Sequence, residues 1–481
     1  MKKQNIIISI IILMLSAYQL SAQNEHDFEG KWLGTLEINE TVKLNLGFEV
    51  NRNNQNAIVS VVHSLDQGAF DIPIECTRIR KDSIIFDIKV MGAFYKGMIN
   101  ENQIIEGSFK QGNGGSIPLN LAKVEEFPVK KALRPQEPQK PYPYSEELVK
   151  IENPNAVGIT LAGTLTLPTG NGPFPAVILL SGSGPNHRDA RIFGHKLFLV
   201  MSDYLTRHGI AVLRTDDRGT YESTGDFNSA DIKELGSDAV ACFLYLLSHK
   251  AIDPERIGVL GHSHGASVAP VAATIDNNIA FAILMAGSAE TGAENIIEQT
   301  EIIYKQNGVS DAGIALNTKL LNNLFNIVSK STDDELARNE FQDFINDFEK
   351  ELKELSQEEL VKLELTPPIS ADMIYGFLTS AMKKDLFFEP DEYLSKMTCP
   401  TLVLAGSKDV QVPVRHLYLT EELIIQNGNE NVTTKEFKGK NHLFQSANTG
   451  AVEEYKNIEE TISPEVLECI SNWIRDLGID L

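Results

Sequence analysis

The residues Gly261-His262-Ser263-His264-Gly265 match the pattern G-x-S-x-G, in which a sharp turn between a strand and a helix exposes one serine hydroxyl. The short apolar segment Arg256–Leu260 precedes the motif and predicts a buried strand. The small, mostly apolar residues Ala266–Thr274 follow it and predict a helix. Both glycines suit such a turn, because strand and helix approach so closely there that a Cβ would clash. Ser263 is therefore a candidate nucleophile.

A serine hydroxyl is a weak nucleophile until a histidine removes its proton and a carboxylate orients that histidine. Asp409 comes just after the predicted strand Thr401–Ala405, and His442 comes just after the predicted strand Val432–Phe437. Functional groups gather at the carboxyl ends of parallel strands, and serine, aspartate, histidine is the chain order of this geometry. The sequence thus predicts a triad of Ser263, Asp409 and His442. The alternatives are a helix-capping role for Asp409 and a surface-loop position for His442.

The oxyanion formed during attack on a carbonyl needs two backbone N–H donors. One predicted donor is His264, the residue after the nucleophile. The other is Ser183, in the loop Ser181-Gly182-Ser183-Gly184-Pro185 after an early predicted strand, with Gly182 or Gly184 as donors if the loop is shifted by one residue. An ordinary glycine-rich turn is the alternative. A phosphate-binding loop is disfavoured, because the lysine and the third glycine of the known motifs are missing.

The elements that would position these groups begin at Ser145, where predicted strands and helices start to alternate. We expect strands at Gly158–Leu167, Ala176–Leu180, Ile210–Arg214, Arg256–Leu260, Ile279–Ala286, Thr401–Ala405 and Val432–Phe437, and helices at Ile192–His208 and Asp231–His249. Apolar strands alternating with helices predict a doubly wound, mostly parallel α/β sheet covered on both faces. The alternation stops at about 290–397, which predicts a helical cap inserted into a domain spanning 145–481.

Three segments precede this domain. Residues 24–126 alternate between apolar and polar side chains, which predicts a small all-β barrel or sandwich. Residues 127–144 contain five prolines and predict a semi-rigid linker. Residues 1–22 begin with Lys2 and Lys3 and continue with a short apolar run, which predicts a signal peptide and export to the periplasm or the medium. A membrane anchor or a buried helix is the alternative for this segment.

Composition narrows the classes of partner. The net charge of −23 argues against nucleic acid or an anionic membrane surface as a partner. The four cysteines have no metal-ligand spacing, and neither a metal nor another cofactor is expected. Export would permit disulfides, so the pairing of these cysteines stays open, as does the oligomeric state.

Residues 145–481 resemble the α/β-hydrolase superfamily, and in particular bacterial serine esterases of the EstD-like and dienelactone-hydrolase-related group. The resemblance is carried by Ser181-Gly182-Ser183-Gly184-Pro185, Arg188-Asp189, Asp217-Arg218-Gly219 and Gly261-His262-Ser263-His264-Gly265. It implies hydrolysis of small-molecule carboxylic esters by the triad. Tyr221 departs from the usual pattern, in which a glycine stands at that position. For Arg188, Asp189, Asp217 and Arg218, a place beside the site and structural ion pairing both remain open.

The sequence leaves two other functions open. A peptidase or amidase can use the same triad, and the acidic cap could bind a free amine. Alternatively, the β domain captures a ligand or surface while the hydrolase domain is inert. The leading expectation is an exported serine esterase for small or medium acyl groups.

Overall fold

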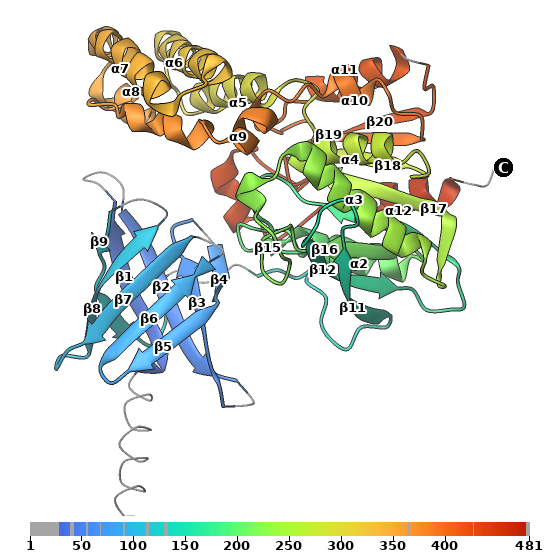
Figure 1. The fold of residues 1–481 in the computed structure, drawn as a ribbon, viewed down its shortest axis with the longest axis horizontal. Helices are drawn as coiled ribbons and strands as arrows, with labels where there is room; N and C mark the ends of the chain where they lie inside the picture. The colour runs from blue at the N-terminus through green and yellow to red at the C-terminus, as the bar shows by residue number, and fades with distance from the viewer. Residues whose placement is uncertain are drawn as a thin grey trace, which may run out of the picture. The chain divides into compact units, whose positions relative to one another are not determined.

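The computed structural model describes residues 28–38, 43–53, 56–67, 69–89, 92–111, 115–128, 133–363, 365–426 and 428–477. The predicted signal segment 1–22 lies outside these residues. The chain forms two compact units (Figure 1). One comprises residues up to Leu133 together with Ile192–Gly194, and the other comprises Arg134–Arg191 and the chain from His195 onward.

The first unit is a single antiparallel sheet, as the alternating pattern predicts. Its strands are β1 (Gly30–Glu37), β2 (Lys43–Arg52), β3 (Ile58–Ser64), β4 (Ala69–Ile74), β5 (Cys76–Arg80), β6 (Ser83–Ile88), β7 (Ala93–Ile99), β8 (Ile104–Gln111), β9 (Ile117–Pro118) and β10 (Leu121–Val124). The pairing order is β4-β3-β2-β1-β10-β8-β7-β6-β5, with β9 beside β8. Because β4 and β5 are separated only by Glu75, the sheet curls back on itself as a barrel (Figure 1). Its interior is filled by side chains such as Trp32, Phe48 and Tyr95.

The second unit is built on a mixed, mostly parallel sheet. Its strands are β11 (Ser145–Glu152), β12 (Thr160–Leu167), β13 (Phe174–Leu180), β16 (Ala211–Thr215), β17 (Ile252–His262), β18 (Ala282–Met285), β19 (Thr401–Gly406) and β20 (Val432–Phe437). The order is β11-β12-β16-β13-β17-β18-β19-β20. The pairs from β16 to β20 are parallel, whereas β12 pairs antiparallel with both β11 and β16. The central strands are apolar on both sides because the sheet is buried on both faces.

The helices around this sheet are α2 (Leu197–Arg207), α3 (Ile232–Leu247), α4 (His264–Ile275), α11 (Arg415–Gln426) and α12 (Pro464–Asp476). Helix α2 packs against α12, whereas α3 packs against α4. The prediction of a helix from Ile192 is wrong at its start. Phe193 and Gly194 have φ of 49° and 77°, which a right-handed helix cannot contain, so short strands β14 (Arg191–Ile192) and β15 (His195–Lys196) precede α2.

A helical cap lies between β18 and β19, where the α/β alternation stops in the sequence. It contains α5 (Gly292–Gln306), α6 (Asp311–Lys330), α7 (Asp334–Glu351), α8 (Gln357–Lys362), α9 (Ser380–Leu386) and α10 (Asp391–Leu394). The cap has its own core, which includes Phe341 and Phe348 from α7. Phe341 and Phe348 therefore lie on the buried face of α7.

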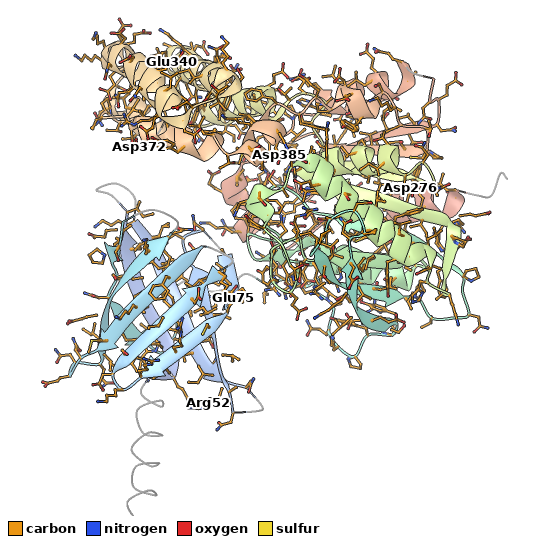
Figure 2. All side chains as sticks on the ribbon, viewed as in Figure 1. Arg52, Glu75, Asp276, Glu340, Asp372 and Asp385 are labelled. Atoms are coloured by element: carbon orange, nitrogen blue, oxygen red, sulfur yellow. The ribbon has the colours of Figure 1, made fainter. Side chains whose placement is uncertain are left out.

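The cap is tied to the sheet domain at the start of α3. Asp385 of α9 accepts a hydrogen bond from the backbone N–H of Ile232 at 2.9 Å, and Lys384 forms an ion pair with Asp231 at 2.7 Å. Figure 2 shows Asp385 where the cap meets the sheet domain.

Two further features bear on the expectations from the sequence. Within the described residues, no helix combines the length and the apolar character needed to cross a bilayer, and all four cysteines are free thiols. Part of the proline-rich segment is anchored to the second unit, since the Arg134 guanidinium donates to the carbonyls of Lys456 and Ile458.

Candidate active site

The turn that carries Ser263 joins β17 directly to α4. Ser263 has φ 55° and ψ −121°, a conformation that non-glycine residues rarely adopt. A Cβ on Gly261 would overlap the carbonyl oxygen of Gly265, and a Cβ on Gly265 would overlap that of Leu180. This is the close approach that the two glycines of the motif predict.

Neighbouring backbone groups hold the strained serine in place. The Ser263 N–H donates to the carbonyl of Met285 at 2.9 Å, and its own carbonyl accepts from the N–H of Ala266 at 2.8 Å. Backbone strain of this kind costs about 1–3 kcal/mol and persists where the surroundings fix the conformation. The Ser263 side chain is partly exposed, so the turn presents its hydroxyl at the edge of the sheet.

Asp409 and His442 form a buried pair at the same edge of the sheet, after β19 and β20. His442 Nδ1–H donates to Asp409 Oδ2 at 2.7 Å. Asp409 Oδ1 accepts from the N–H groups of Gln411 and Val412 at 2.8 and 2.9 Å. These bonds fix the carboxylate and place the imidazole proton on Nδ1, which leaves Nε2 as a base. A Cβ on Gly406 would overlap the carbonyl of Lys440, so this glycine lets the two loops meet.

His262 links the serine turn to the histidine loop, a role that the sequence reasoning did not find. Its Nε2–H donates to the backbone carbonyl of His442 at 2.8 Å, and the two rings lie 4.9 Å apart. Burial, together with the nearby His442, lowers the pKa of His262 to about 4, so it is neutral at pH 7. The structure thus brings Ser263, Asp409 and His442 to one edge. The only sequence signal for His262 is its place in the motif.

One predicted oxyanion donor follows Ser263 directly in the chain, and the loop that carries the other passes close to Ser263. His264 is the first residue of α4, so its N–H has no partner within the helix. The loop of Ser183 passes the serine, since a Cβ on Gly182 would lie 3.4 Å from the Ser263 Cβ. A cavity of about 40 Å³ is lined in part by Gly182 of this loop, His264 and Asp217.

The cap also contacts this part of the site, and no sequence pattern predicts that contact. His264 Nε2 lies 3.8 Å from Asp385 Oδ2 of α9. Burial raises the pKa of Asp385 to about 6 and lowers that of His264 to about 4. At neutral pH the Asp385 carboxyl is therefore mostly ionised and the His264 imidazole is uncharged, so the contact is not an ion pair.

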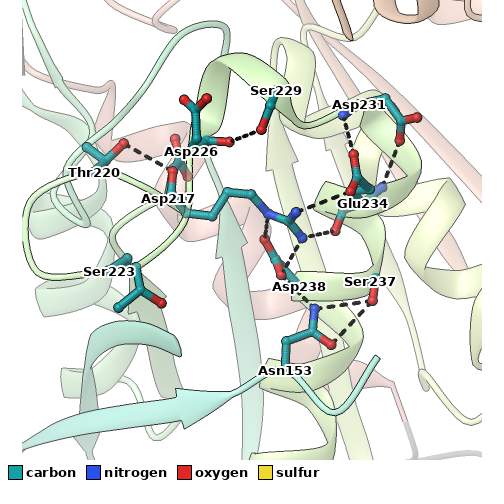
Figure 3. A network of polar contacts seen from close by, with 12 residues as sticks. Asn153, Asp217, Thr220, Ser223, Asp226, Ser229, Asp231, Glu234, Ser237 and Asp238 are labelled. Carbon is teal, nitrogen blue, oxygen red and sulfur yellow. Dashed lines mark hydrogen bonds and ion pairs between the residues drawn. The ribbon is translucent and has the colours of Figure 1, made fainter. Parts of the chain in front are cut away.

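The residues whose role the sequence left open all have partners in the sheet domain. Arg188 pairs with Asp216 and Glu222, Asp189 pairs with Arg214, and Arg218 pairs with Asp238. Figure 3 shows the Asp238 end of the last pair, where Asn153 also donates to the carboxylate at 2.7 Å. Structural ion pairing thus accounts for these two arginines and for Asp189. Asp217 differs, because it bonds to the Ser181–Pro185 loop.

One group of potential metal ligands occurs among the described residues. Glu290, Glu298 and His416 bring their ligand atoms within 4.8 Å of one another. Arg415 forms ion pairs with both glutamates at 2.5 Å, and His416 Nε2–H donates to Glu298 at 2.9 Å. The arginine supplies the positive charge that a cation would bring, so the cluster is explained as a contact between the cap and α11.

The chain is similar to several known hydrolases. A family model described as X-Pro dipeptidyl-peptidase (S15 family) matches residues 158–423. Esterase EstD of Thermotoga maritima is 27% identical over 316 residues, which cover 65% of each protein. Acyl-coenzyme A thioesterase 3 of Mus musculus is 31% identical over 156 residues, which cover 32% of this chain and 31% of that protein. The chain therefore matches less than two thirds of the length of each of these relatives.

Two of the similar solved structures are named as esterases. The Pyrococcus furiosus esterase Pf2001 has a TM-score of 0.40 and 16% identity, covering 72% of this chain and 97% of that one. Est1E of Butyrivibrio proteoclasticus, in a complex with ferulic acid, has a TM-score of 0.38 and 14% identity, covering 69% and 98%. The family match spans more than half of the chain and includes Ser263 and Asp409. The chain belongs to the X-Pro dipeptidyl-peptidase (S15) family.

Proposed function

We propose that the protein is a serine hydrolase that cleaves carboxylic esters of small or medium acyl groups. The observation that carries the proposal is the buried pair of Asp409 and His442, at the same sheet edge as the strained Ser263 turn. The likeness to esterase EstD supports esters as the substrate class.

In the proposed reaction, the Ser263 hydroxyl attacks the ester carbonyl while His442 Nε2 takes its proton. The carbonyl oxygen becomes an oxyanion and accepts hydrogen bonds from the N–H groups of His264 and Ser183. The tetrahedral intermediate collapses, and His442 passes the proton to the departing alcohol. Water then attacks the acyl-enzyme with His442 as base, which releases the acid and restores Ser263. Asp409 holds the imidazole orientation throughout.

The test compares native protein with Ser263→Ala on p-nitrophenyl acetate and butyrate. Ser267→Ala is the matched control, because Ser267 is also partly exposed and lies one helical turn along α4. We expect turnover by native protein and by the control, and none above background from Ser263→Ala. Turnover that survives the Ser263 substitution would contradict the assignment. A series of longer acyl chains then locates the preferred length.

A second candidate is peptide or amide hydrolysis by the same triad, which the family match favours. Aminoacyl-naphthylamides and an X-Pro p-nitroanilide would be assayed beside the esters. A higher kcat/KM for an amide than for the best ester would reverse the ranking.

We also propose that residues 1–22 are a signal peptide that is removed on export. The charged start and the short apolar run of this segment support the proposal. Expression in a bacterial host with fractionation tests it. We expect mature protein that begins at Gln23 outside the cytoplasm, and full-length protein confined to the cytoplasm would argue against export.

A further inference from the structure

Asn186 lies at the end of the predicted oxyanion loop and binds that loop at three points. Its Nδ2 amide donates to the carbonyl oxygens of Gly182, Ser183 and Gly184, at 3.0, 3.3 and 2.7 Å. Nothing in the sequence singled out Asn186, since its partners are backbone atoms. The three bonds make one side chain the centre of a tight turn.

The position of Asn186 is itself fixed by Asp217. The Asn186 N–H donates to Asp217 Oδ2 at 2.8 Å, and the Asn186 carbonyl accepts from the Asp217 N–H at 3.1 Å. The Ser181 hydroxyl donates to both oxygens of the same carboxylate, at 2.7 and 2.9 Å. Asp217 follows β16, and the loop follows β13, so two adjacent strands anchor the amide.

Sheet order places Asn186 and Ser263 on opposite sides of this loop. Strand β13 lies between β16, whose end carries Asp217, and β17, whose end carries Ser263. On the β17 side, a Cβ on Gly182 would meet the Ser263 Cβ at 3.4 Å. The carbonyls therefore face the β16 side, toward the Asn186 amide.

In a trans peptide, the C=O and the N–H of one plane point in opposite directions. When the Gly182 carbonyl faces Asn186, the N–H of Ser183 points away from Asn186, to the side of the loop on which β17 lies. The Ser183 carbonyl orients the N–H of Gly184 in the same way. We propose that Asn186 is a positioning residue of the oxyanion hole, which turns the Ser183 N–H toward the carbonyl oxygen of the substrate. This inference rests on the proposed serine-hydrolase function.

The chemistry of the side chain explains why asparagine is suited to this position. An amide supplies two N–H donors on a planar group, which can be shared among three carbonyls. Aspartate has the same shape but would place carboxylate oxygens against those carbonyls. Leucine fills a similar volume without any donor. The two substitutions therefore remove the side-chain N–H groups that bond to the loop, with little change in the size of the side chain.

The experiment measures kcat and KM on p-nitrophenyl butyrate and the rate of labelling by a fluorophosphonate, for native protein, Asn186→Asp and Asn186→Leu. Misaligning one oxyanion donor should lower kcat and the labelling rate together, by about tenfold to a hundredfold, because donors of this kind contribute up to about 10³-fold. KM should stay within about threefold, since the donor acts mainly on the transition state. Asn431→Asp is the control, because Asn431 is exposed just before β20, at the opposite edge of the sheet.

A kcat within twofold of native in a folded Asn186 variant would overturn the inference, and so would a loss confined to KM. If neither variant folds, Asn186→Gln replaces them, with both donors one methylene farther out. It should show a reduced kcat with unchanged KM, and native kcat there would overturn the inference. Absence of labelling in native protein would instead overturn the proposed function itself.

Discussion

Replacing Asp409 with asparagine tests whether this carboxylate sets the protonation of His442. In the native structure Oδ1 accepts from the N–H groups of Gln411 and Val412, and Oδ2 accepts from His442 Nδ1. An asparagine oxygen would keep the two backbone donors, because its amide NH₂ cannot accept them. The NH₂ would then face His442 Nδ1 and donate to it.

This change would move the imidazole proton to Nε2, the atom that must accept the proton of Ser263. A base in the wrong tautomer costs about 10⁴-fold in kcat in a serine hydrolase of this kind. That factor corresponds to about 5.4 kcal/mol of transition-state free energy. The two backbone bonds to residue 409 survive, so we expect the melting temperature to change far less than the activity.

The assay is kcat on p-nitrophenyl butyrate with a thermal melt of each variant. Asp276→Asn serves as control, because Asp276 also accepts a backbone N–H but lies just after α4, away from His442. A folded Asp409→Asn protein with kcat within tenfold of native would refute the argument. The same kcat loss in the Asp276 control would show that the assay reports general damage.

Three further predictions concern the surroundings of the serine. Gly265→Ala should lower the free energy of unfolding by about 1–3 kcal/mol in urea denaturation, since the new Cβ would overlap the Leu180 carbonyl; unchanged stability would show that the turn can open. Ser183→Ala should keep kcat within twofold, because the proposed donor is a backbone N–H, and a loss above tenfold would point to the hydroxyl. Burial raises the pKa of Asp217 to about 7, so the native carboxyl keeps its proton to higher pH than the unfolded one, and its contribution to stability falls as pH rises from about 4 to 7. That contribution is on the order of 4 kcal/mol, at 1.36 kcal/mol per pKa unit. In urea denaturation, Asp217→Asn should reduce the fall of the unfolding free energy between these pH values. An equally steep fall in the variant would show that other groups cause the pH dependence.

Periodicity and turn chemistry made most of the sheet domain predictable. The strand Val432–Phe437 has the predicted bounds, and β13 and β19 begin or end within two residues of expectation. These strands lie in the middle of the sheet or carry clear alternation, so local sequence and tertiary burial favour the same structure. The predicted start of α2 was wrong, because the left-handed backbone conformations of Phe193 and Gly194 depend on the surrounding fold and not on the spacing of apolar residues.

The candidate site was predictable where roles depend on chain order and strand ends. Asp409 and His442 are 33 residues apart in the chain, yet the distance from His442 Nδ1 to Asp409 Oδ2 is 2.7 Å, as that ordering implies. The contacts of His262 and Asp385 could not be predicted from the sequence. His262 bonds to a backbone carbonyl, and Asp385 comes from a cap whose packing no sequence pattern specifies.

Covalent labelling is the sharpest test of whether Ser263 is the nucleophile. Native protein and Ser263→Ala would be treated with a fluorophosphonate, and the adduct mapped by mass spectrometry of proteolytic peptides. We expect one stoichiometric adduct on Ser263, which forms more slowly when Asp409 is replaced and is absent from Ser263→Ala. An adduct on another serine, or no adduct on folded native protein, would contradict it.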